Sequence, residues 1–203
     1  MCLISGCPRS GTAYIARFLQ ANGIRVKHEV EDTDGIVSWL FLQGIKQHGR
    51  LPVPRPFHQY YPILHQVRYP LHTIASLHTI HPSSWDYFKQ FLPLSEDPVV
   101  AAMQVYLYWN RMIEAAADYS YAVEHLPLSL NKLRELLKVP LDAKYCDLVN
   151  PKTNSREHAE LTWMELRDCS KDLTDEVFEY GRRFYPAGTP IQPPPKPAED
   201  YVI

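Results

Sequence analysis

A glycine-rich turn near the amino terminus has the residue types of an anion-binding site. The segment 6–12 reads Gly-Cys-Pro-Arg-Ser-Gly-Thr and lies between an apolar stretch and an amphipathic one. A turn between a buried strand and a helix points several backbone N–H groups at one position, where the helix dipole adds positive potential. Arg9 adds a fixed charge, and Ser10 and Thr12 add hydroxyl donors. These features predict a nest for phosphate or sulfate.

The glycine spacing of this turn also resembles the Walker A loop of kinases and ATPases. That loop has Lys directly after its second glycine, whereas Thr12 follows Gly11 here and the basic residue is Arg9. The sequence also lacks an obvious apolar strand that ends in a Mg²⁺-binding Asp. A P-loop nucleotide kinase or NTPase is therefore the less favoured alternative, beside a glycine turn that merely begins a helix.

A second basic position follows a later apolar stretch. Arg68 stands directly after the segment 63–67, and Ser76 lies eight positions further on. Ligands of open α/β sheets bind at the carboxyl ends of strands, where Arg68 would lie. Pro70 would open the next helix and bring the Ser76 hydroxyl to the same anion. A nucleotide with anionic groups at both ends would bind across the two sites, unless Arg68 is only an exposed strand end.

Together the two segments resemble the sulfotransferases that use PAPS (3′-phosphoadenosine-5′-phosphosulfate) as donor. Pro8-Arg-Ser-Gly-Thr12 matches the family's 5′-phosphosulfate loop, and Arg68 with Ser76 matches its 3′-phosphate motif. The resemblance implies a P-loop-like fold, PAPS as co-substrate, PAP as product and no metal. The donor-binding residues that it implies are Pro8, Arg9, Ser10, Gly11, Thr12, Ala13, Arg68, Ser76 and Arg156.

Weaker segments resemble bacterial members of that family over residues 1–170. Val123-Glu-His-Leu126 has His125 where the family has Asp, and we interpret it as structural. The segments Asn154-Ser-Arg-Glu-His158 and Leu161-Thr-Trp163 resemble a late nucleotide-covering segment, which would bring Arg156 to the 3′-phosphate.

Sulfuryl transfer requires stabilisation of the leaving phosphate oxygen and a base for the acceptor proton. Arg9 is placed for the first task, although its pKa is too high for it to donate a proton. The resemblance places the base just beyond the first helix, which indicates Glu29, with His28 as its rival and Glu31 and Asp32 as further competitors. Because adjacent strand residues face opposite ways, we expect only one of His28 and Glu29 to face the site. An exposed strand-end carboxylate is the alternative interpretation of Glu29.

These residues must be positioned by strands and helices, which the apolar spacing predicts. The expected fold is a three-layer α/β sandwich with a mainly parallel central sheet, like P-loop nucleoside-triphosphate hydrolases. One domain is expected over residues 1–185, with a proline-rich tail over 186–203. The expected elements are strands at 2–4, 63–67 and 121–124, helices at 12–21, 71–77, 98–117, 130–137 (capped by Ser129) and 174–185, and irregular stretches at 48–62 and 81–98.

Composition limits the remaining functional classes. The net charge of −2 over 203 residues gives no indication of nucleic-acid or membrane binding. Four cysteines without CxxC pairing, no apparent signal peptide and no apolar run that could span a bilayer predict a cytoplasmic protein. His78 and His81 are too weak a ligand set to predict a metal site.

The acceptor is expected to be a small molecule or a carbohydrate with a hydroxyl or amine. Neither its identity nor the oligomeric state can be read from the sequence. A non-catalytic nucleotide-binding protein of the same fold is a further alternative.

Overall fold

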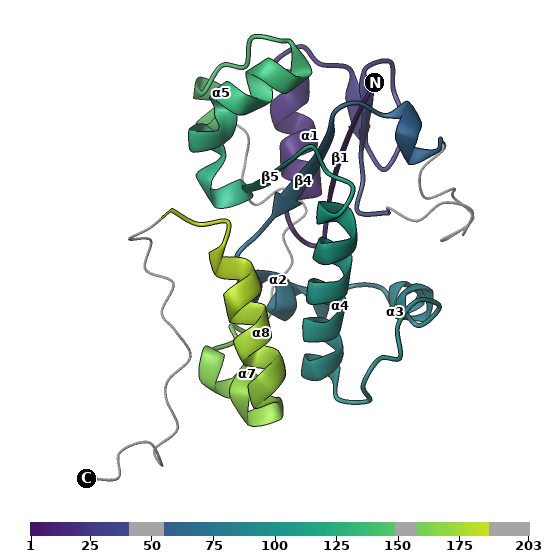
Figure 1. Ribbon diagram of the computed structural model, residues 1–203, viewed down its shortest axis with the longest axis vertical. Coiled ribbons are helices and arrows are strands. Elements are labelled where there is room, and N and C mark those ends of the chain that lie inside the picture. Colours follow the sequence, from purple (N-terminus) through teal and green to yellow (C-terminus); the bar gives the residue numbers. More distant parts are fainter. Residues whose placement is uncertain (41–54, 149–157, 187–203) are drawn as a thin grey trace.

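The computed structural model describes residues 1–40, 55–148 and 158–186 (Figure 1). At its centre is a five-stranded sheet in the order β2-β3-β1-β4-β5, in which all neighbouring strands are parallel. The α/β fold with a parallel central sheet is thus confirmed. The strands are β1 Cys2–Gly6, β2 Val26–His28, β3 Gly35–Val37, β4 Ile63–Val67 and β5 Tyr119–Ala122.

Helices cover both faces of the sheet and make the three layers that the sequence predicts. One face packs against α1 (Thr12–Ala21) and α5 (Leu126–Leu137). The other packs against α4 (Pro98–Glu114), which in turn contacts three further helices (Figure 1). These are α2 Pro70–Leu77, α7 Trp163–Cys169 and α8 Lys171–Arg182, and the short helices α3 Pro82–Phe88 and α6 Lys144–Leu148 complete the described helices.

The core is divided by the alternation of side chains along β1. Leu3 points into the cluster beneath α4, whereas Ile4 points into the cluster beneath α1 and α5. The register aligns Leu3 with Ile63 and Ile4 with Leu64, so each face is continued by the neighbouring strand. Cys7, directly after β1, is fully buried in the α4 cluster. A parallel sheet covered in this way is apolar on both faces.

Several predicted boundaries were wrong. Strand β5 begins at Tyr119, not at residue 121, and residues 123–125 form a 3₁₀ turn, η2 (Val123–His125). Helix α5 begins at Leu126, so Ser129 lies inside the helix and does not cap it. Pro127 sits in the first turn, where the missing N–H costs no intrahelical bond. Helix α4 ends at Glu114, three residues before the predicted end at 117.

The stretch 81–98, predicted to be irregular, contains the seven-residue helix α3. His81 caps it by accepting a hydrogen bond from the Ser83 N–H. The last helix was predicted at 174–185, but α8 spans 171–182 and a separate α7 precedes it. The single domain over 1–185 stays a prediction, and the tail from residue 187 lies outside the described residues.

Candidate active site

The strand order places a crevice at the carboxyl ends of β1 and β4. From β1 the chain moves outward to β2, returns to β3, and then crosses to β4 and β5 on the other side. Ligands of open α/β sheets bind where the order reverses in this way. The turn after β1 contains Arg9, and the turn after β4 contains Arg68. The fold therefore brings the two predicted anion sites to one place.

The turn after β1 has the backbone of an anion nest. Arg9 and Gly11 both adopt left-handed conformations, with φ of 69° and 89°. Gly11 is the N-cap of α1 and has no side chain to accept hydrogen bonds from the first-turn amides, which leaves them for an anion. At Gly6 any Cβ would collide with the backbone carbonyl oxygen of Gln66. The glycines are thus needed for this path.

Gln66, a residue of β4 that was not predicted as part of the site, fixes this turn through a hydrogen bond to its backbone. Its Nε2 donates to the Ser10 carbonyl oxygen at 2.6 Å, and its Oε1 accepts from the Tyr121 hydroxyl at 3.0 Å. The signal was a pair of buried polar residues, His65 and Gln66, in a strand whose other three residues are apolar. Ser10 itself is fully buried, and its Oγ has no hydrogen-bond partner among the described residues.

A cavity of about 380 Å³ opens above the turn. It contains most of the predicted donor-binding residues, but Pro8 and Ser10 are buried and do not line it. Arg156 lies outside the described residues. The cavity is lined by Arg9, Gly11, Thr12, Ala13, Tyr14, His28, Glu29, Trp39, Arg68, His72, Ser76, Val123, Glu124 and His158.

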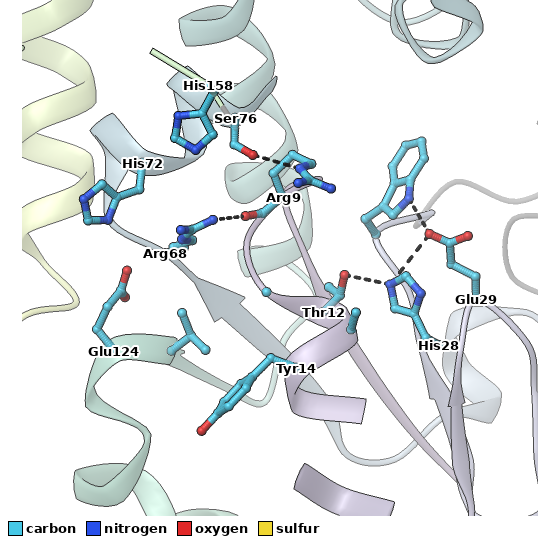
Figure 2. A pocket seen from close by; sticks show the side chains of 14 residues that line it. Arg9, Thr12, Tyr14, His28, Glu29, Arg68, His72, Ser76, Glu124 and His158 are labelled. Atoms are coloured by element: carbon cyan, nitrogen blue, oxygen red, sulfur yellow. Dashed lines mark hydrogen bonds and ion pairs between the residues drawn. The ribbon is translucent and has the colours of Figure 1, made fainter. Parts of the chain in front are cut away.

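The two arginines lie beside one another in this cavity (Figure 2). Arg68 Nη1 donates to the backbone oxygen of Arg9 at 2.9 Å, and Arg9 Nε donates to the Ser76 hydroxyl at 2.9 Å. Burial lowers the pKa of Arg68, because the guanidinium loses part of its hydration, while nearby Glu124 opposes the shift. Since like charges in a partly dehydrated site repel, a bound anion would stabilise this arrangement.

His28 and Glu29 both line the cavity, so the expectation that only one of them faces it was wrong. Strand β2 ends at His28, and Glu29 has a left-handed backbone with φ of 60°. The alternation of a strand therefore no longer applies to Glu29. The proposed competitors do not line the cavity: Glu31 pairs with Arg55 at 2.8 Å, and Asp32 pairs with Lys27 at 3.0 Å.

The two side chains have different partners (Figure 2). His28 Nε2 lies 3.0 Å from Thr12 Oγ1 and 3.7 Å from Glu29 Oε1. Glu29 Oε1 accepts a hydrogen bond of 2.8 Å from Trp39 Nε1. Burial lowers the pKa of His28, and the charge of Glu29 opposes this shift. His28 is thus neutral at pH 7 and has an imidazole nitrogen within hydrogen-bonding distance of the first turn of α1.

Glu124, which we interpreted as structural, also lines the cavity. It lies just beyond the carboxyl end of β5, and such strand ends are where a functional residue would be sought. Within the described ranges, no group of three or more His, Cys, Asp or Glu side chains is arranged to hold a metal ion. No helix of those ranges is long and apolar enough to cross a membrane.

The sequence matches no protein-family model, and it matches no curated protein. Among solved structures, the crystal structure of mouse sulfotransferase SULT7A1 complexed with PAP is similar at 14% sequence identity and a TM-score of 0.46. The similarity covers 90% of this chain and 83% of that chain.

Proposed function

We propose that this protein is a sulfotransferase that moves the sulfuryl group of PAPS to a hydroxyl or amine of an acceptor and releases PAP. The observation that supports this most is the placement of Arg9 and Arg68 in one cavity. Each follows a different strand, and each belongs to a sequence motif that resembles a PAPS-binding motif of the family. The cavity volume of about 380 Å³ falls within the range of small-molecule sites.

The residues present fit the donor. In this proposal the first-turn amides of α1 and Arg9 bind the 5′-phosphosulfate, while Arg68 and Ser76 bind the 3′-phosphate. Arg156 joins them in the proposal, as the sequence resemblance implies. Arg9 stabilises the negative charge that builds on the leaving phosphate oxygen. Because the chemistry is positioning plus electrostatic stabilisation, a fixed cation on a rigid turn suits it.

The proton of the acceptor passes to the His28–Glu29 pair. PAPS supplies an activated sulfur: the acceptor oxygen or nitrogen bonds to it as the bond to the bridging phosphate oxygen breaks. A neutral His28 can take the proton directly, and the adjacent carboxylate of Glu29 stabilises the imidazolium that forms. Glu29 can equally take the proton itself. His28 Nε2 and Glu29 Oε1 lie 3.7 Å apart, so either side chain is close enough to support the other during the transfer.

The first test is calorimetry with PAP and AMP, which differ by the 3′-phosphate. We expect PAP to bind roughly 10- to 100-fold more tightly, since charge-assisted hydrogen bonds contribute about 1.5–3 kcal/mol each. Arg68→Ala should abolish most of this difference. Arg17→Ala is the control, because Arg17 is an exposed α1 residue that does not line the cavity.

Equal affinities for PAP and AMP in the unaltered protein would remove the 3′-phosphate site from the proposal. Robust Mg²⁺-dependent hydrolysis of ATP by the purified protein would favour the nucleotide kinase or NTPase alternative instead.

A further inference from the structure

A carboxylate stands in the part of the cavity that holds Arg68. Strand β5 pairs with β4 so that Ala122 lies beside Val67. The residues that follow the two strands, Arg68 after β4 and Val123 and Glu124 after β5, line the cavity. Glu124 lies next to Tyr69, whose backbone N–H donates to Glu124 Oε1 at 2.9 Å. The strand pair that places Arg68 therefore also places Glu124. A carboxylate beside a phosphate site would repel the phosphate, so Glu124 is expected to have another task in ligand binding.

Glu124 is held in position although its residue is exposed. Its second oxygen, Oε2, accepts a hydrogen bond of 2.9 Å from the Tyr185 hydroxyl. Burial raises the pKa of Tyr185, and the charge of Glu124 raises it further, so the phenol stays protonated and keeps donating. The Tyr185 ring packs edge-on against Tyr69 at 6.1 Å and against His125 at 5.4 Å. Glu124 is thus tied to the β4–α2 turn and to the segment that follows α8.

The Glu124 carboxylate can accept further hydrogen bonds, and this favours a ligand group that donates a hydrogen bond over one that is negatively charged. An ionised carboxylate has about four acceptor positions and no donor, and the two hydrogen bonds described above occupy two of them. What remains can accept a hydrogen bond from a hydroxyl or amine, and it repels a further anion. Figure 2 shows the Glu124 carboxylate directed toward the region between Arg68 and His72. A ligand anion bound by Arg68 would therefore have an acceptor beside it.

We propose that Glu124 recognises the ribose 2′-position of the nucleotide, an inference that rests on the proposed function. With the 3′-phosphate on Arg68, the 2′-oxygen lies on the adjacent ribose carbon and its hydroxyl donates to Glu124. A phosphate at the 2′-position would instead bring a dianion against a fixed carboxylate. A 2′-deoxyribose would leave the carboxylate without that donor. Glu124 thereby selects 3′-phosphonucleotides that have a free 2′-hydroxyl.

The experiment compares three ligands by calorimetry: PAP, its isomer adenosine 2′,5′-bisphosphate, and 2′-deoxy-PAP. We expect the unaltered protein to prefer PAP over the isomer by roughly 100-fold or more, and Glu124→Gln to reduce this preference at least roughly tenfold. The loss should come mainly from tighter binding of the isomer. Glu124→Gln should also bind PAP and 2′-deoxy-PAP with more similar affinities.

Two variants separate recognition from a structural role. Glu124→Asp keeps the charge and should keep the rejection of the isomer, which a general disturbance of the cavity would not do. Glu160→Gln removes the same charge from an exposed residue that does not line the cavity, although its charge acts on the pKa of His72. This variant should leave the preference for PAP over the isomer unchanged.

Failure of PAP to bind the unaltered protein would overturn the proposed function together with this inference. Tight PAP binding with the same isomer preference in Glu124→Gln would overturn the role of Glu124 alone. If Glu124→Gln instead loses discrimination between PAP and its inosine counterpart, the carboxylate contacts the base, and the ribose assignment is wrong.

Discussion

Glu29 is held in position by a hydrogen bond from Trp39, whose indole belongs to an aromatic cluster. The Trp39 indole that donates to Glu29 packs edge-on against Tyr87 and Phe88, with ring centroids at 5.9 and 5.7 Å. Trp109 Nε1 in turn donates to the Trp39 backbone oxygen at 2.7 Å. A carboxylate anchored in this way is pre-organised for one geometry, which is what a catalytic base or a partner of a base requires.

Replacement of either member of the pair should slow transfer without weakening the donor site. We expect Glu29→Gln and His28→Gln each to lower kcat by roughly 10²–10⁴, the effect of losing a positioned base, with PAP affinity nearly unchanged. Turnover can be measured as reverse transfer from a phenyl sulfate to PAP. Because burial lowers the pKa of His28 from its usual 6.5, the acid limb of kcat/KM should lie below pH 6.5 if His28 is the base.

Glu31→Gln serves as the control, since Glu31 accepts from Tyr60 and pairs with Arg55 outside the cavity lining; this variant should keep full turnover. Should His28→Gln alone lose activity, the base is His28 and Glu29 is dispensable. Full turnover in both His28→Gln and Glu29→Gln would show that the base lies outside this segment.

Helices and strands were predicted correctly where neighbouring residues in the sequence mark both the apolar face and the ends of the element. Helix α1 was predicted with both of its boundaries, because its apolar spacing is regular and Asn22-Gly23 ends it. Strand β4 and the Pro70 start of α2 were also correct. Strands β2 and β3 have three residues each, which is too short for a period to be visible. Helix α7 was missed although Thr162 and Glu165 form a capping box.

His65 joins three elements through its imidazole and makes the fold sensitive to acid. From β4, its Nδ1 and Nε2 lie 3.0 Å from Ser120 Oγ of β5 and from Asn110 Oδ1 of α4. Burial lowers its pKa from 6.5 to about 4, with Asn110 opposing the shift. The folded state thus binds the proton more weakly than the unfolded state. The stabilisation is fully present above about pH 6.5 and is lost as the pH falls toward 4.

Unfolding by urea should therefore show a fall in the free energy of unfolding, of roughly 2–3 kcal/mol from this residue, between pH 7 and 4.5. His65→Gln should be less stable at pH 7, because it disturbs a buried network, but its stability should vary less over this pH range. His58→Gln, which changes an exposed histidine, should follow the unaltered protein. An unchanged pH dependence in His65→Gln would contradict the assignment.

Over the whole molecule, the sequence could indicate the parts of the site better than their arrangement. Arg9 and Arg68 were recognised from local motifs, and both line the cavity. Their adjacency depends on the order of the strands, which is decided by packing between segments far apart in the chain. Glu124 was interpreted as structural for the same reason, since only the pairing of β5 with β4 brings it to Arg68. Gln66 was missed because its partners, Ser10 and Tyr121, are equally distant in sequence.

Because Cys7 is buried at the start of the phosphate turn, the rate at which its thiol is alkylated reports how often this turn opens. Burial raises the pKa of this thiol well above 9.0, so a maleimide can react with it only when the turn opens, whereas Cys169 is exposed. A nucleotide at about 100 times its Kd stabilises the closed turn by roughly 2.7 kcal/mol. Alkylation of Cys7, followed by mass spectrometry of its peptide, should then slow roughly 100-fold while that of Cys169 does not change. Equal slowing of both thiols, or of neither, would mean that the ligand does not close this turn.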